Sequence, residues 1–219
     1  MTVLQELDLD IGGRTLRVVR SGQGGPAVIL EAGSGCGAEI WRTVQELTGE
    51  VTATYSYDRA GQVPSPYLLV GHSLGGHIVR AFAARHRADV FGMILIDVRH
   101  EDLYPTLPEP FLARLAELSP EDTERARSAD TLIRSLPDLG DLPLTVITHG
   151  QADWIPDSFG LGQDVLDQAE LAWQRHQASL AARPQSRFVV AANSGHIIPL
   201  DQPELVATEI CTMAVQTGH

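Results

Sequence analysis

"LVGHSLGGHIVRAFA", residues 69–83, places Ser73 among Gly71, Gly75 and Gly76. The apolar residues before Gly71 predict a short buried strand, and the apolar residues after Gly76 recur at the spacing of a helix. Inside a strand or a helix, each glycine costs roughly 0.5–1 kcal/mol relative to alanine. The stretch therefore predicts a tight turn or a close backbone approach at the junction of the two elements.

A G-x-S-x-G sequence between a buried strand and a helix is the context of a nucleophile elbow, which projects the serine hydroxyl from the sheet. A serine hydroxyl is a poor nucleophile unless a base accepts its proton. The predicted base is His196, in "NSGHIIPLDQPELV" (residues 193–206), where a turn of small residues separates a strand from the last predicted helix. Ser73 and His196 are thus the predicted nucleophile and general base.

Two aspartates qualify as the acid that orients His196. Asp153 lies three residues beyond Gly150 in "VITHGQADW", and Asp97 lies directly at the end of the strand in "MILIDVRHED". Either gives the chain order serine, aspartate, histidine, and either carboxylate would stabilise the imidazolium without taking its proton. We predict Asp153 as the acid, with Asp97 as the alternative.

Acyl transfer also needs hydrogen-bond donors for the developing oxyanion, each worth on the order of 10²–10³ in rate. One predicted donor is the backbone N–H of Leu74, the residue after the nucleophile. The second is the backbone N–H of Ser34, in the turn "GSGCG" (residues 33–37). This turn contains no lysine, so it does not match a phosphate-binding loop.

The rest of the chain alternates short apolar runs with helical patterns, which predicts an α/β fold with a largely parallel sheet covered on both faces. We expect one domain over residues 1–219, with helical pieces in the segment 101–140. The predicted strands cover residues 4–11, 14–20, 26–33, 51–61, 67–73, 90–98, 142–150 and 186–193, and the other predicted helices cover 38–47, 76–86, 168–183 and 203–216.

Composition narrows the possible partners of the 219-residue chain. A net charge of −12 argues against a nucleic-acid surface, because phosphate binding needs clustered Lys and Arg. No secretory leader pattern and no run of about 18 apolar residues is found, so we expect a cytoplasmic protein without a membrane span. Cys36 and Cys211 are expected to be free thiols. The scattered histidines lack metal-binding spacing, so no cofactor or metal is implied.

The chain resembles the α/β-hydrolase superfamily, and in its GHSLGG elbow a serine esterase or lipase-like member. The resemblance covers nearly the whole chain and implies an eight-stranded, mostly parallel sheet, an acyl-enzyme, and a small helical cap at 101–140. Because position 73 is Ser rather than Asp, the haloalkane dehalogenase and epoxide hydrolase branches are set aside. The residues that carry the resemblance are "VILEAGSG", "YSYDRAG", "VGHSLGGHIVRAFAARH", "MILIDVRHED", "ITHGQAD" and "SGHIIPLDQPELV".

Three departures from the family stand out, and one of them is the presence of two candidate acids. The oxyanion turn reads "EAGSG" where many relatives begin with His-Gly. The eight residues 59–66 separate Asp58 from Tyr67, where the family normally has a helix. Fully extended they reach about 26 Å, which suffices for a taut crossover but not for a helix. Either the chain is a shortened member, or residues are missing from the printed sequence near Gln62 and Val63.

The sequence therefore predicts a serine hydrolase that cleaves a small-molecule carboxylic ester, lactone or thioester, with no oligomeric state indicated. Two alternatives stay open: a perhydrolase or acyltransferase with the same triad, and a ligand-binding sensor with little turnover. The apolar stripe of the 101–140 segment is either an acyl pocket or ordinary helix core, as are Trp154 and Phe159 at the border of the same region. The stripe comprises Phe111, Leu112, Leu115 and Leu118.

Overall fold

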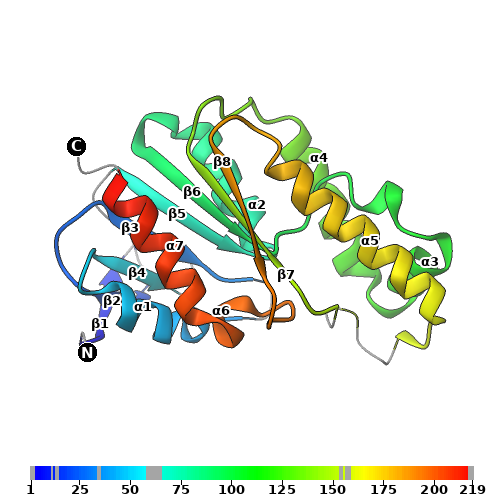
Figure 1. Ribbon diagram of the computed structural model, residues 1–219, viewed down its shortest axis with the longest axis horizontal. Coiled ribbons are helices and arrows are strands. Elements are labelled where there is room, and N and C mark those ends of the chain that lie inside the picture. The colour runs from blue at the N-terminus through cyan, green and yellow to red at the C-terminus, as the bar shows by residue number, and fades with distance from the viewer. Residues whose placement is uncertain are drawn as a thin grey trace.

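The computed structural model describes residues 3–10, 12, 15–33, 36–57, 66–152, 155 and 159–216. Eight strands form one sheet in the order β1-β2-β4-β3-β5-β6-β7-β8 (Figure 1). Only the pairs β1–β2 and β2–β4 are antiparallel among its neighbours, so the predicted α/β fold with a mostly parallel eight-stranded sheet is confirmed. The strands are β1 (Gln5–Asp10), β2 (Thr15–Ser21), β3 (Ala27–Glu31), β4 (Thr54–Tyr57), β5 (Tyr67–His72), β6 (Val90–Ile96), β7 (Leu144–His149) and β8 (Ser186–Ala191).

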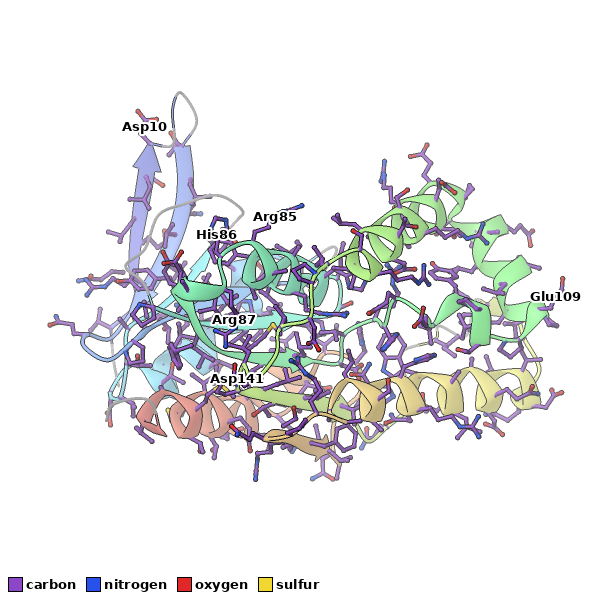
Figure 2. The ribbon with its side chains drawn as sticks, turned by 90° about the horizontal axis from the view of Figure 1, so that it is seen from above. Asp10, Arg85, His86, Arg87, Glu109 and Asp141 are labelled. Carbon is purple, nitrogen blue, oxygen red and sulfur yellow. The ribbon has the colours of Figure 1, made fainter. Side chains whose placement is uncertain are left out.

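Helices cover both faces of the sheet, with α1 and α7 on one side and α2 on the other (Figure 2). Trp41, Val44 and Ile210 pack against one face, and Val79 and Leu180 pack against the opposite face. None of the described helices is long and apolar enough to cross a membrane. The helices are η1 (Ala38–Trp41), α1 (Arg42–Thr48), α2 (Gly75–Arg85), η2 (Arg87–Asp89), η3 (Tyr104–Thr106), α3 (Glu109–Leu118), α4 (Pro120–Arg134), α5 (Gln163–Leu180), α6 (Ile198–Asp201) and α7 (Pro203–Gln216).

Burial follows the order of the strands in the sheet. Every residue of β5 after Tyr67 is buried, and β6 is buried except at Phe91. Strands covered on both faces need continuous apolar runs, and these two strands have them. β1, at the edge, is exposed along almost its whole length. β7 is buried at every residue, so β5, β6 and β7 form the most fully buried part of the sheet from which a side chain can project.

The segment between β6 and β7 forms η3, α3 and α4, which together with α5 make a helical lobe at one end of the molecule (Figure 2). A separate apolar cluster fills this lobe, in which Phe111 of α3 packs with Ala169 and Trp173 of α5. Leu118, at the end of the same stripe, is 44% exposed. The predicted stripe is thus core at Phe111 and surface at Leu118.

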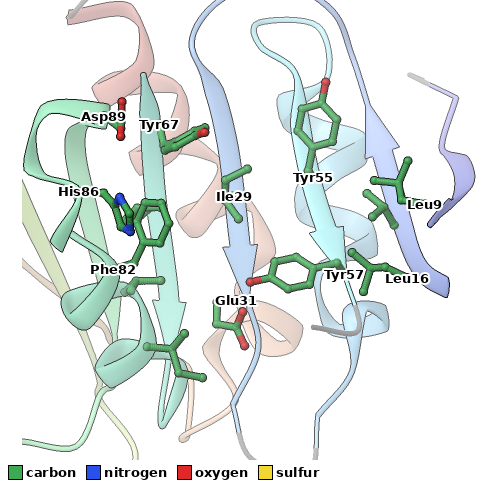
Figure 3. Close-up of a pocket in the computed structure, with 14 residues that line it drawn as sticks. Leu9, Leu16, Ile29, Glu31, Tyr55, Tyr57, Tyr67, Phe82, His86 and Asp89 are labelled. Atoms are coloured by element: carbon green, nitrogen blue, oxygen red, sulfur yellow. The ribbon is translucent and has the colours of Figure 1, made fainter. Parts of the chain in front are cut away.

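A groove lies on the α2 side of the sheet, next to the short connection noted in the sequence. β4 and β5 lie on either side of β3, and residues 58–65 of their connection, with the step between Gln62 and Val63, fall outside the described residues. The groove has a volume of about 420 Å³, and α2 and η2 are the described helices that contribute to its wall. Figure 3 shows the side chains that line it, among them Ile29, Tyr55, Tyr57, Tyr67 and Phe82.

Candidate active site

Ser73 lies immediately after β5 in a left-handed backbone conformation, with a φ of 52°. Side-chain-bearing residues avoid this region because Cβ crowds the backbone. The conformation is fixed from outside the turn, since the N–H of Ser73 donates to the carbonyl of Ile96 at 3.1 Å. Strand β6 therefore holds the turn in the shape that a nucleophile elbow requires.

The glycines after Ser73 permit close packing on neighbouring backbone and side chains. A Cβ on Gly75 would lie within 2.8 Å of the carbonyl oxygens of Glu31 and Ala32, and a Cβ on Gly76 would collide with Val98. Helix α2 can therefore begin directly against the end of β3 because Gly75 lacks a side chain, and against Val98 after β6 because Gly76 lacks one.

His196 links Ser73 to a carboxylate. Its Nε2 lies 3.1 Å from Ser73 Oγ, and its Nδ1 lies 2.6 Å from Oδ2 of Asp97. Asp97 follows β6 and is fully buried, whereas the side chain of His196 is 23% exposed. A hydroxyl, an imidazole and a carboxylate thus form a continuous hydrogen-bonded series, and the elements that carry them end at the same edge of the sheet.

Of the other predicted site residues, some are described by the structure and some are not. Leu74 is the N-terminal cap of α2, where the first backbone N–H groups of a helix have no partner within the helix. Asp153, Ser34 and Trp154 lie outside the described residues. Among the described residues, Asp97 is the aspartate whose side chain meets His196.

The carboxylate of Asp97 accepts hydrogen bonds at both oxygens. Oδ1 accepts from the indole N–H of Trp173 at 3.0 Å and from the hydroxyl of Thr148 at 3.2 Å. Oδ2 lies 2.8 Å from Nδ1 of His149 and also faces His196. Burial alone would raise the pKa of Asp97, but the hydrogen bonds and charges of the two histidines outweigh it and hold the pKa well below its usual range. Asp97 is therefore ionised.

His149 and Glu170 were not predicted as site residues. His149 ends β7, and its Nε2 lies 3.1 Å and 3.2 Å from the two carboxylate oxygens of Glu170 on α5. Burial lowers the pKa of His149, but hydrogen bonds with Asp97 and Glu170 reverse the effect and raise it to about 9. The available signal was a histidine at the end of a strand, in "ITHGQAD", next to the strand that ends at Asp97.

The turn that carries His196 is held on two sides. The Oγ of Ser194 donates to Asp201 at 3.0 Å, and the carbonyl of Ser194 accepts the N–H of Gly150 at 3.1 Å. Nε2 of His72 donates to the carbonyl of His196 at 2.9 Å. Burial, followed by the neighbouring His196, lowers the pKa of His72 to about 4. His72 is therefore a neutral donor that fixes the backbone of the turn.

Comparisons with known proteins identify the family and the fold. A model described as "Alpha/beta hydrolase family" matches residues 60–209. The uncharacterized protein YqjL of Bacillus subtilis is 27% identical over 220 residues, which cover 85% of this chain and 83% of YqjL. Since 85% of a 219-residue chain is fewer than 220 residues, YqjL carries residues that this chain lacks.

Solved structures resemble the whole described fold. The epoxide hydrolase CorEH has a TM-score of 0.62 and 14% identity, covering 98% of this chain and 99% of its own. An esterase from Thermogutta terrifontis has a TM-score of 0.58 and 20% identity, covering 97% of this chain and 98% of its own. At these identities the likeness shows the fold, and that fold is shared by proteins with different chemistries.

Proposed function

The chain belongs to the alpha/beta hydrolase family, and from that premise we propose that it is a serine hydrolase that cleaves a carboxylic ester, lactone or thioester through an acyl-enzyme on Ser73. The observation that carries the proposal is the series from Ser73 Oγ through His196 to Asp97, with separations of 3.1 Å and 2.6 Å. A solved esterase among the structures of similar fold is in keeping with it.

In the proposed reaction, Ser73 Oγ attacks the carbonyl carbon of the substrate while His196 Nε2 takes the hydroxyl proton. The tetrahedral intermediate collapses, the bond to the leaving group breaks, and His196 donates its proton to that group. Water, deprotonated by the same imidazole, then releases the acid product. Asp97 stabilises the imidazolium during both steps. Ser73 stands where a carboxylate would be needed to attack an epoxide or an alkyl halide, so we do not propose those reactions.

The proposed oxyanion donors are the backbone N–H groups of Leu74 and Ser34. The position of Leu74 at the start of α2 supports the first assignment, because helix N-termini favour negative charge. The second assignment rests on the sequence, as Ser34 lies outside the described residues.

We propose that residues 101–140 act as a cap within a single domain. The lobe that they form with α5 reaches the catalytic series through Trp173, whose ring lies edge-on to that of His196 at 5.8 Å between centroids. Trp173 also packs with Phe111 in the apolar cluster of the lobe. Apolar side chains of the lobe thus continue to the edge of the site, where they would contact an acyl group.

The first test compares the wild type with Ser73→Ala on p-nitrophenyl esters from acetate to decanoate, together with labelling by a fluorophosphonate. We expect turnover and labelling in the wild type, and a loss of kcat of at least about 10⁴-fold in the variant, because no other group can form the acyl-enzyme. Ser128→Ala, at an exposed position of α4, is the matched control and should match the wild type. A wild type that neither turns over nor reacts with the fluorophosphonate would contradict the proposal and favour a binding protein.

The same assay decides between the two acids. We expect Asp97→Asn to lower kcat by about 10⁴-fold, since the amide cannot stabilise the imidazolium or select its tautomer. Asp153→Asn should keep most of the activity. If the two results are exchanged, Asp153 is the acid and the carboxylate of Asp97 has a structural role.

A further inference from the structure

One oxygen of Asp97 serves two histidines from opposite sides. Oδ2 lies 2.6 Å from Nδ1 of His196 and 2.8 Å from Nδ1 of His149. The carboxylate that orients the general base is therefore shared, and the second imidazole has no contact with Ser73 in the described structure. The sharing raises the question of what charge His149 brings to the site.

The contacts of His149 require both of its ring nitrogens to donate. Nδ1 faces the carboxylate of Asp97, and Nε2 faces both oxygens of Glu170, while the side chain itself has no exposed surface. A neutral imidazole carries one N–H and would turn a lone pair toward one of these carboxylates. An imidazolium satisfies both contacts. Its pKa of about 9, raised against the effect of burial by Asp97 and Glu170, agrees with that assignment.

Helix α5 holds the outer carboxylate in place. Nε2 of Gln174 donates to Glu170 at 2.8 Å and to the carbonyl of His149 at 3.1 Å. The hydroxyl of Thr148 donates to Oε1 of Gln174 at 3.1 Å as well as to Asp97. The group Glu170–His149–Asp97 is thus a connected network with a net charge of −1, in which the carboxylate of Asp97 contacts His196 and the positive charge of His149 lies on the other side of that carboxylate.

Building on the proposed function, we propose that His149 is a permanently charged positioning residue that, through the shared carboxylate of Asp97, opposes protonation of His196 and keeps it available as a base in mildly acidic solution. A protonated His196 cannot accept the proton of Ser73, and the positive charge of His149 offsets part of the negative charge that Asp97 presents to the imidazole of His196. Glu170 balances the charge and limits the effect.

The other titratable groups around the pair do not supply this charge. On the β5 side, His72 is neutral, with its pKa lowered to about 4 by burial and by His196. On the α6 side, Asp201 is engaged by the hydroxyl of Ser194 and the N–H of Gly195. From β6 and α5 come the two carboxylates already described. Among the described groups, His149 is the cation that contacts the carboxylate of Asp97.

The proposal predicts opposite shifts for two variants in the dependence of kcat/KM on pH. His149→Asn keeps an N–H donor for Asp97 but removes the positive charge, so the acidic limb should move to higher pH by about one unit or more. Glu170→Gln removes a negative charge, so the limb should move to lower pH. The double variant should fall between the two. His149→Gln serves as a second neutral variant if His149→Asn does not fold.

A merely structural role for His149 would lower activity without shifting the two limbs in opposite directions, and that result would overturn the proposal. A second measurement does not depend on turnover. Imidazole ¹⁵N shifts, assigned through His149→Asn, should show both nitrogens of His149 protonated at pH 7.5, with the proton lost only as the pH rises through about 9. A neutral His149 at pH 7.5 would contradict the proposal. Ser73-independent hydrolysis would instead contradict the proposed function.

Discussion

Two residues at the ends of adjacent strands have the same unusual backbone. Ser73 and Asp97 have φ values of 52° and 45°, in the left-handed region that L-residues avoid. Each is held by a backbone hydrogen bond to the next strand, from the N–H of Ser73 to Ile96 and from the N–H of Asp97 to Ile147 at 2.7 Å. The sheet thus stabilises a conformation that is unfavourable for each residue alone.

This strain at Ser73 can be measured as a difference between two inactive variants. Ser73→Gly should unfold with a free energy about 1 kcal/mol higher than Ser73→Ala, because glycine has no Cβ to crowd the left-handed conformation. Denaturant unfolding of the two variants measures the difference.

At the control position, the order of stability of the glycine and alanine variants should be reversed. At Ser128, in the middle of α4, glycine should be less stable than alanine by about 1 kcal/mol, as in an ordinary helix. If the order of glycine and alanine is the same at both positions, the backbone of Ser73 is not strained.

Single residues were predictable where a local motif defines them. Ser73 and His196 stand in turns whose small neighbours mark them, and the structure brings the two side chains together. The acid could not be assigned, because Asp97 and Asp153 follow adjacent strands and the sequence does not say which side chain turns toward His196. His149 and Glu170 were not predicted, because their contact depends on the rotation of α5 against β7.

At the scale of elements, a buried carboxylate joins α4 to α2 and to the segment that follows β6. Asp130 of α4, 2% exposed, lies 2.7 Å from Arg99 and 3.1 Å from Nε2 of His77 on α2. Arg99 also donates to the carbonyl of Ala126 at 2.9 Å. The contact links the helical lobe to the helix that begins at the nucleophile elbow.

Asp130→Asn should lower the free energy of unfolding by about 2–4 kcal/mol, because the guanidinium of Arg99, which is only 16% exposed, loses its buried counter-charge while the shape of the side chain at position 130 is kept. Asp138→Asn is the control. Asp138 pairs with Arg183 but is 86% exposed, so its loss should cost at most about 1 kcal/mol. Equal effects in thermal or denaturant unfolding would show that the buried pair does not hold the lobe.

The predicted bounds of the elements agree best with the observed bounds where the apolar periodicity is strong. All eight predicted strands appear, because buried parallel strands need uninterrupted apolar runs. In the segment 101–140 only helical pieces were predicted, whereas α4 runs without a break from Pro120 to Arg134. Its first half lacks an apolar stripe and is supported by Glu121 and Asp122 in the first turn and by the pair of Arg125 with Glu121.

At the scale of the whole molecule, the strands beside the groove are less fully buried than the strands away from it. β4 lies inside the sheet between β2 and β3, yet Tyr55 and Tyr57 face the groove (Figure 3) and are only partly buried. The sequence predicts that residues 59–66 are too few for a crossover helix, and most of this connection lies outside the described residues. It could not predict how α2 lies on this face of the sheet, where Ile78, Val79 and Phe82 line the groove.

The rates of native-state hydrogen exchange should therefore follow how fully each strand is buried, and not only its place in the strand order. We expect the amides of β5 and β6 to exchange most slowly and those of β1 most quickly. β4 should exchange measurably faster than β5 and β6, although all three have strand neighbours on both sides. If β4 exchanges as slowly as β5 and β6, the groove is closed in solution.

Four consecutive strands each deliver one member of the polar series at their carboxyl ends: Ser73 after β5, Asp97 after β6, His149 at the end of β7 and His196 in the turn after β8. Sliding any one strand by two residues would move its member by about 7 Å, well beyond hydrogen-bond reach. Suppose that variants with substituted core residues were screened for turnover alone. Each active variant would then have the four strands assembled in their native register. Such a screen would select for folding accuracy without any measurement of stability.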